Sequence, residues 1–241
     1  APLAATFYYF RKNYTFYAPS LKFVDFSYLK NLMPLSFDFF LLSISTLILY
    51  FSQNIIITQL LGPEKVAVFN IAYKYFFYII LIQTLILNPV WSASIEAYNL
   101  GDLNWIKKII RKLLKIWVGL VGIIIIMVIF ANQFYLLWIK GKVFIPMEVT
   151  ISMGLYVIFF SWYSNFAYII NGIGKIKLQL YLISSVAIFN IILSIVFIKY
   201  LGLGVEGVIL SSVLCTIPGA LLIPLQLKKI LNKKAEGIWL R

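Results

Sequence analysis

The residues of this sequence that could bind a ligand or take part in catalysis are polar or charged side chains inside long apolar blocks. Lys74 lies about eight residues into one such block, which is roughly 12 Å along a helix. Asn70 and Tyr78 lie four residues before and after it on the same helical face, and Asn88 falls near that stripe. The pattern favours a cation that faces a polar cavity. A structural lysine that is paired, or that snorkels to the headgroups, is the alternative.

A second group of polar residues begins at Asp38, near the start of an earlier apolar block. It continues at helical spacing through Ser45, Thr46, Ser52, Gln53 and Gln59. Asp38 could be a functional carboxylate, or a charge near the headgroups that the helix dipole favours. A face in contact with lipid would not carry such a stripe. It indicates either a polar cavity or hydrogen bonds between helices.

Two later apolar blocks also carry polar residues on one side. Residues 123–129 carry only apolar side chains and are expected to face lipid. The polar residues are Ser161, Ser164, Asn165, Tyr168 and Asn171 in one block and Ser184, Asn190 and Ser194 in the next. Together with the two stripes above, this pattern is typical of a helical bundle around a water-filled cavity, as in a transporter.

Enzyme chemistry is not expected. The chain has no histidine and a single cysteine, so a histidine-based relay, a zinc cluster and an internal disulfide are excluded. Phosphate loops, nucleophile elbows and metal-ligand spacings are missing. The segment 171–174 is interpreted as a tight turn rather than a glycine-rich loop. We therefore expect no cofactor, no metal and no catalytic residue.

The elements that must position these residues are membrane helices. Of the 241 residues, 62% are hydrophobic and 12% are charged, far below the usual share of about 25% in soluble proteins. Six blocks reach the roughly 20 apolar residues of a membrane span. They lie at about 35–60, 66–96, 116–138, 148–171, 179–200 and 207–227. The predicted fold is all-α, a polytopic lobe of six transmembrane helices.

The net charge of +13 comes from basic residues that lie mostly between these blocks, which favours membrane topology and anionic lipid over nucleic acid. Sixteen Lys and Arg residues fall on one side of the predicted membrane and four on the other, with Lys74 inside a span. This asymmetry places both ends of the lobe in the cytoplasm. Residues 102–115, with Asp102 as the N-cap, are predicted to form a separate amphipathic helix at the interface.

The remaining segments lie outside the lobe. Residues 1–10 resemble the end of a preceding membrane helix, 11–34 are expected to be a cytoplasmic linker between lobes, and 228–241 a basic cytoplasmic tail. The chain begins at Ala1 rather than Met, and we interpret it as the C-terminal part of something longer.

Short segments in a particular order give the sequence a resemblance to a known family. They are LLGPE at 60–64, VAVF at 66–69, YK at 73–74, NPVWSA at 88–93, EAY at 96–98, GD at 101–102, WIKK at 105–108, NGIGK at 171–175 and GLGVEG at 202–207. The chain resembles the bacterial polysaccharide or O-antigen repeat-unit flippases over most of residues 35–225. Their superfamily also holds the multidrug extruders and the lipid II flippase.

The resemblance implies a function and a location. Such proteins have two six-helix lobes around a central cavity, so this chain would be the second lobe and would need a first. The implied partner is an undecaprenyl-pyrophosphate-linked oligosaccharide, flipped across the bacterial inner membrane by alternating access for O-antigen or capsule synthesis. Polysaccharide assembly proteins are further implied partners.

The same resemblance suggests roles for single residues. Lys74, and less directly Asp38, would correspond to cavity charges, with Glu96 at the cytoplasmic mouth. Asn70, Tyr78, Asn88, Asn165 and Tyr168 are the other candidate cavity residues.

Three other functions stay open, and one of them is a non-transporting structural membrane subunit. A drug or cation extruder of the same superfamily should have an acidic cavity, and the deepest charge here is Lys74. A membrane-embedded polysaccharide polymerase or ligase needs a large outer loop, and the predicted outer loops at 61–65, 139–147 and 201–206 are short.

Overall fold

The computed structural model describes residues 2–12, 14–18 and 25–240. Ala1 lies outside the described residues, as do Lys22 and Arg241, which belong to the sixteen basic residues on one side of the predicted membrane. The chain divides into two units, Ala1–Phe37 and Asp38–Arg241. The first unit holds the helix α1 (Pro2–Lys12) and the short helix η1 (Thr15–Tyr17). In α1, Lys12 Nζ donates a hydrogen bond of 2.9 Å to the Tyr8 hydroxyl.

Six helices of the described residues are long and apolar enough to cross a membrane. They are α2 (Ser27–Leu61), α3 (Pro63–Asn99), α4 (Leu103–Ile129), α6 (Met147–Ile173), α7 (Lys177–Lys199) and α8 (Val205–Leu231). Two shorter helices are α5 (Ala131–Ile139) and η3 (Gly237–Leu240), and the described part contains no strand. The predicted all-α fold with six spans is therefore confirmed.

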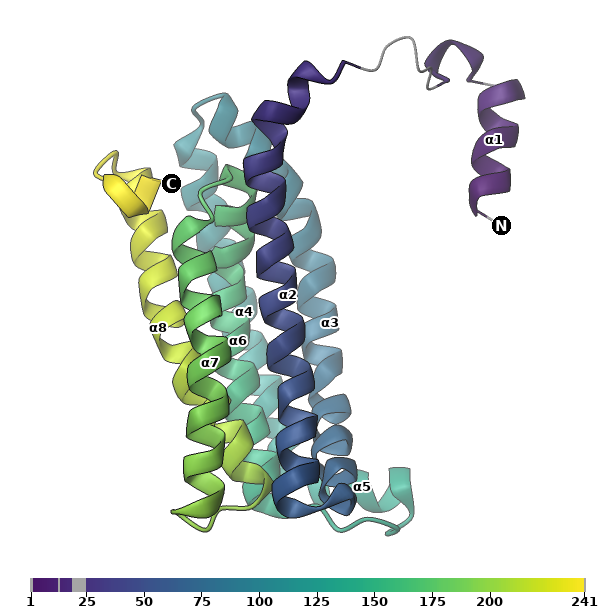
Figure 1. Ribbon diagram of the computed structural model, residues 1–241, viewed down its shortest axis with the longest axis vertical. Coiled ribbons are helices and arrows are strands. Elements are labelled where there is room, and N and C mark those ends of the chain that lie inside the picture. The colour runs from purple at the N-terminus through teal and green to yellow at the C-terminus, as the bar shows by residue number, and fades with distance from the viewer. Residues whose placement is uncertain (1, 13, 19–24, 241) are drawn as a thin grey trace. The chain divides into compact units, whose positions relative to one another are not determined.

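The six helices run alternately up and down, so the turns collect at two opposite ends (Figure 1). The α2–α3 turn, α5 and the α7–α8 turn lie at one end, and the α3–α4 and α6–α7 turns lie with the C-terminus at the other. The loops predicted to be basic thus share one end of the bundle, referred to below as the basic end. Its assignment to the cytoplasm stays a prediction.

The helix α4 corrects one expectation. The structure has a single helix from Leu103 to Ile129 where a separate interfacial helix at 102–115 and a span at 116–138 were expected. Asp102 does cap it, since its carboxylate accepts a hydrogen bond of 2.9 Å from the backbone N–H of Trp105. No proline interrupts α4, and Ile106, Leu113 and Leu120 continue one buried face across residue 115. The helix therefore runs on without a break.

Other boundaries also shift. The segment 11–34, expected to be a linker, contains the end of α1, η1 and the first turns of α2. The expected tail at 228–241 begins as the last turn of α8 and folds back through η3. There Lys229 Nζ lies 3.9 Å from the centre of the Trp239 ring, and Gln226 Nε2 donates to the Trp239 carbonyl at 3.2 Å.

Helix α6 is the central element of the second unit, because it packs against α3, α4 and α8, while α7 packs against α8. The buried apolar side chains form two clusters along it. One includes Val149 and Met153 and the other includes Ile169 and Ile173. Between them α6 carries the buried polar residues Ser161, Ser164 and Asn165. The bundle thus has a polar layer near half its height.

Two glycines near the C-terminal end of α6 shape how this helix ends and how it packs. Gly174 follows the last turn with a φ of 75°, a left-handed conformation that glycine adopts without strain, and its N–H bonds to the Ile170 carbonyl at 2.9 Å. Near this end Gly172 lies against α3, where an added Cβ would be 2.7 Å from the Trp91 carbonyl oxygen. Close packing of α3 and α6 therefore requires glycine at residue 172.

Candidate functional site

A cavity of about 310 Å³ lies within the second unit, among α2, α3, α6, α7 and α8. Its principal lining residues are the polar Thr46, Gln53, Ser164, Asn171, Gln179, Ser212 and Thr216 and the aromatic Tyr50, Phe69, Tyr73, Tyr156, Phe160, Tyr163 and Tyr168. Helix α4 contributes no described residue to this lining, and Ile123, Ile125 and Ile126 are exposed on it, as expected for a side that faces lipid. Four of the five lining helices had been expected to carry a polar side.

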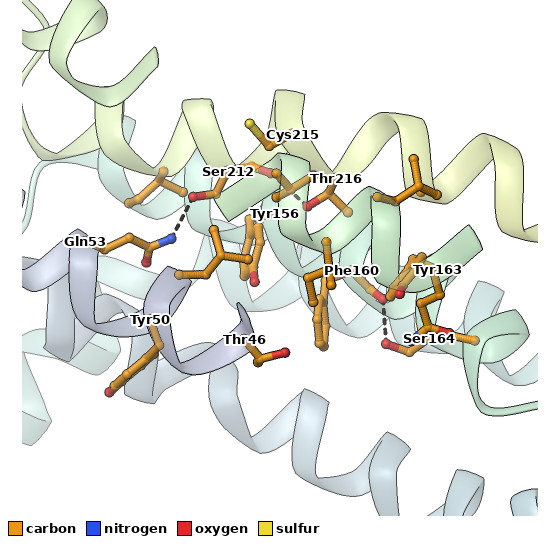
Figure 2. Close-up of a pocket in the computed structure, with 18 of the residues that line it drawn as sticks. Thr46, Tyr50, Gln53, Tyr156, Phe160, Tyr163, Ser164, Ser212, Cys215 and Thr216 are labelled. Atoms are coloured by element: carbon orange, nitrogen blue, oxygen red, sulfur yellow. Dashed lines mark hydrogen bonds between the residues drawn. The ribbon is translucent and has the colours of Figure 1, made fainter. Parts of the chain in front are cut away.

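One wall of the cavity is aromatic. Tyr156, Phe160 and Tyr163 follow one another on α6 at spacings of four and three residues, so their rings lie on one face of that helix (Figure 2). The Tyr156 and Phe160 rings stack with centroids 5.8 Å apart. On the opposite side Tyr50 of α2 meets Tyr73 of α3 at 5.6 Å. Such rings offer flat apolar surfaces with hydroxyl groups at their edges.

Amide and hydroxyl groups supply the polar part of the lining. Gln53 Nε2 of α2 donates a hydrogen bond of 2.8 Å to Ser212 Oγ of α8 (Figure 2). In the described part of the chain, Asn171 Oδ1 and Gln179 Oε1 are buried and have no hydrogen-bond partner. A buried acceptor without a donor costs about 1–3 kcal/mol. The cavity is therefore suited to a molecule, or to water, that can donate hydrogen bonds to these two oxygens.

None of the described residues that line the cavity is Lys, Arg, Asp or Glu. An ion would therefore find no opposite charge there to offset the loss of its hydration. The chemistry of the site is stacking on aromatic rings together with hydrogen bonding to amides and hydroxyls. It can hold a neutral ring system or a sugar.

Part of the polar stripe expected along α2 attaches that helix to its neighbours. Ser45 Oγ lies 3.4 Å from Ser184 Oγ of α7, and Gln53 reaches Ser212 of α8. Thr46 lines the cavity, and Asp38 is half-buried at the basic end of the unit. Of the two explanations that the spacing left open for the stripe, hydrogen bonding between helices accounts for Ser45 and Gln53.

The lysine in α3 is not in this cavity. Lys74 is exposed, and within the described residues it has no hydrogen bond or ion pair, whereas the preceding Tyr73 lines the cavity. Tyr78, Asn88 and Glu96 are also exposed. With Lys74 they follow one side of α3 at spacings of four, ten and eight residues, which is one stripe of a helix with 3.6 residues per turn. We call these four residues the α3 polar stripe.

Three further expected site residues have other positions. Asn70 Nδ2 donates to Asn54 Oδ1 of α2 at 3.0 Å, so it joins α2 to α3. Asn165 is buried in the polar layer and accepts a hydrogen bond of 3.1 Å from Gln83 Nε2. Tyr168 lines the cavity and meets Trp91 edge to face at 5.7 Å. Of the eight expected site residues, the cavity lining therefore includes Tyr168.

Most of the aromatic lining was not expected from the sequence. Tyr50, Phe69, Tyr156, Phe160 and Tyr163 were not singled out, because aromatic residues are frequent in every apolar block of this chain. A usable signal existed in α6, where three aromatic residues share one face with Ser164 and Asn171. The contribution of α8 through Ser212 and Thr216 was also missed.

No protein-family model matches the sequence, and no curated protein matches it. Two solved structures do. A crystal structure of a MATE mutant has a TM-score of 0.73 at 19% identity, and the match covers 90% of this chain and 48% of that one. An outward-facing multidrug resistance MATE family transporter of the MOP superfamily has a TM-score of 0.67 at 20% identity, with the same coverage of 90% and 48%.

The chain thus spans about half the length of the two structures that it matches. At these identities the likeness concerns the arrangement of the helices. With its six apolar helices, this protein has the multi-pass membrane fold of one half of a MATE transporter.

Proposed function

We propose that this chain forms one lobe of an alternating-access transporter that flips an oligosaccharide linked to undecaprenyl pyrophosphate across the bacterial cytoplasmic membrane. Its C-terminus would be cytoplasmic, and a second lobe would complete the path. The likeness to half of a MATE transporter supports the architecture. The resemblance of residues 35–225 to polysaccharide flippases supports the substrate class.

The observation that carries the proposal is the α3 polar stripe. From Lys74 to Glu96 it runs about 33 Å along α3, which is close to the roughly 30 Å of the hydrocarbon core. All four side chains are exposed on this lobe. The exposed Leu81 and Leu85 lie on the same side between Tyr78 and Asn88, so the polar groups stand toward the two ends of the stripe. Polar and charged groups at these positions would be unfavourable against lipid. The stripe supports a wall of a hydrated path between this lobe and another.

Lys74 suits the phosphate end of such a substrate. An unpaired lysine within the bilayer costs about 2.5–3.5 kcal/mol on insertion scales, and a bound anion would offset that cost. Pyrophosphate oxygens accept charge-assisted hydrogen bonds from an ammonium group. Tyr78, one turn away, and Asn88 offer a ring and an amide to the sugars. The chain's residues thus provide a cation for the phosphates and neutral polar groups for the oligosaccharide.

The test is genetic complementation. The complete gene that encodes this chain is expressed in a bacterium that lacks its own polysaccharide flippase, and surface polysaccharide is measured. Restored polysaccharide is expected. Lys74→Ala should reduce it at least tenfold, because one charge-assisted hydrogen bond is worth about 1.5–3 kcal/mol. Lys74→Arg should retain most of it.

Lys65→Ala is the matched control, because Lys65 is an exposed lysine at the start of the same helix and is not part of the stripe. It should leave the polysaccharide unchanged. An expressed wild-type protein that restores nothing would contradict the proposed substrate. Full activity of Lys74→Ala would contradict the role of the lysine while leaving the transporter itself in place.

The neutral aromatic cavity favours a second candidate function, extrusion of planar amphipathic compounds. Its stacked rings and unpartnered amide oxygens suit uncharged ring systems. If this is the function, Phe160→Ala should lower resistance to such compounds severalfold, whereas Lys74→Ala should not. Drug susceptibility and surface polysaccharide measured on the same two variants distinguish the two functions.

A further inference from the structure

The first four turns of α4 carry an unusual group of basic side chains. Lys108, Arg111, Lys112 and Lys115 line a hollow of about 430 Å³ on that helix, together with Trp105 and Ile109. We call Lys108, Arg111, Lys112 and Lys115 the α4 basic face. All four are exposed, and none forms an ion pair with a described residue.

This face points away from the protein. Ile106, Leu113 and Leu120 are buried and mark the side of α4 that packs on the bundle. At about 100° per residue, Lys108 and Lys115 lie on the opposite side of the helix. The four cations also repel one another, and none of them forms an ion pair with a described residue. An anion from outside the chain would relieve this repulsion.

The continuity of α4 sets the depth of the basic face. Because the helix is unbroken, the side that carries Lys115 continues directly into Gly119, Gly122 and Ile126. Ile126 is 56% exposed, and a Cβ added at either glycine would meet nothing within 4 Å. Below the cations there is therefore a shallow apolar notch on the outer side of the helix. A charged hollow directly above an apolar notch matches the headgroup and the acyl chain of one lipid.

We propose that α4 holds an anionic phospholipid of the membrane leaflet at the basic end of the bundle. The phosphodiester of its headgroup lies among Lys108, Arg111, Lys112 and Lys115, and one acyl chain lies along Gly119 and Gly122. The bidentate guanidinium of Arg111 suits a phosphate better than a lysine does. Trp105 lies at the rim, at the depth where tryptophan is favoured at membrane interfaces.

A general role in topology does not require this arrangement. Scattered basic residues near the ends of the helices set orientation wherever they stand. They need neither a hollow between four cations nor a glycine notch beneath it. A phospholipid site requires both, so the two explanations predict different effects of the glycines.

The experiment titrates phosphatidylglycerol onto the detergent-purified, delipidated protein and counts bound lipid by native mass spectrometry. Phosphatidylcholine and inorganic phosphate are titrated in parallel. Phosphatidylglycerol should bind at least tenfold more tightly than either. Each Lys or Arg near an anionic surface is worth about fivefold in affinity, so combining Lys108→Gln, Arg111→Gln and Lys112→Gln should weaken binding roughly a hundredfold.

The matched control combines Lys177→Gln, Lys233→Gln and Lys234→Gln. It removes the same charge from exposed lysines outside the α4 basic face, and the segments that carry them lie at the same end of the bundle (Figure 1). It should change the affinity less than threefold. An equal loss in both triple variants would mean diffuse electrostatic attraction and would overturn the proposal. Equal binding of phosphatidylcholine, or of inorganic phosphate alone, would overturn it as well.

A second variant leaves the charge unchanged. Gly119→Leu with Gly122→Leu fills the notch, and the open space around both glycines means that the fold should tolerate it. Phosphatidylglycerol should then bind about fivefold more weakly. If the triple charge variant does not fold, the double glycine variant alone tests the proposed lipid site. Unchanged affinity of that variant for phosphatidylglycerol would refute the site.

Discussion

Gln83 of α3 and Asn165 of α6 meet inside the bundle, where Gln83 Nε2 donates a hydrogen bond of 3.1 Å to Asn165 Oδ1. Gln83 also donates to the Ser161 carbonyl at 2.7 Å. Both side chains are buried, at 3% and 4% exposure, between the two apolar clusters of the core. Trp117 of α4 reaches the same layer through a bond of 3.0 Å to Ser161 Oγ. This polar layer holds α3, α4 and α6 in one register.

Gln83→Leu is expected to lower the thermal stability of the purified protein, because it leaves Asn165 Oδ1 without its donor. Hydrogen bonds between membrane helices are worth about 0.6 kcal/mol on average and up to about 1.7. Asn165→Leu should lower the thermal stability by a similar amount. The double variant should lose less stability than the two single variants added together, since it leaves no amide without a partner. Gln59→Leu, at an exposed site on α2, is the control. Strictly additive losses would contradict the coupling.

Gly172→Ala is expected to destabilise the protein although alanine is the better helix former. The added Cβ would lie 2.7 Å from the Trp91 carbonyl oxygen and 3.0 Å from Ser94 Cβ, so α3 and α6 must separate. Overpacking of this kind costs typically about 1–3 kcal/mol. Gly122→Ala, where nothing lies within 4 Å, should be neutral or stabilising by up to about 1 kcal/mol. Melting temperatures in one detergent compare the two, and an equal change in both would be evidence against the close approach.

Gln53→Ala is expected to loosen α2 and to expose the cavity. The bond from Gln53 to Ser212 is one of few polar attachments of α2. Cys215, the single cysteine of the chain, is buried and lines the cavity, so its alkylation rate reports on opening. Loss of a bond worth about 1 kcal/mol should raise that rate about fivefold. Gln59→Ala should not raise it. An unchanged rate in Gln53→Ala would show that the bond does not limit access to Cys215.

Tyr135 of α5, outside the six spans, predicts a pH dependence. Burial raises the pKa of its phenol from 10.0 to about 12, although a hydrogen bond from Thr150 acts in the opposite direction. The folded state then binds more protons than the unfolded chain between about pH 10 and 12, so stability falls as the pH rises through that window. Tyr135→Phe should remove this part of the decline. Thermal unfolding measured across the window checks it, and an identical decline in both proteins would disprove the assignment.

The sequence predicted the fold, but not how the polar residues are grouped in space. Six spans followed from the length and apolarity of the blocks, and the N-cap at Asp102 followed from local chemistry. The residues expected around one cavity were dispersed: Lys74 lies on an exposed face, Asn165 lies in the polar layer and Tyr168 lines the cavity. Their spacing along one helix was correct, but the rotation of each helix against its neighbours could not be obtained from it.

The sequence by itself thus determined that the chain forms six membrane helices, because a bilayer imposes length and apolarity on each span separately. It also determined the basic asymmetry of the loops. Only the tertiary structure decided that α4 is unbroken, that Tyr73 rather than Lys74 lines the cavity, and that Gln53 attaches α2 to α8. The physical reason is that helix rotation depends on side-chain packing between distant segments, and residues next to each other on a helix point about 100° apart.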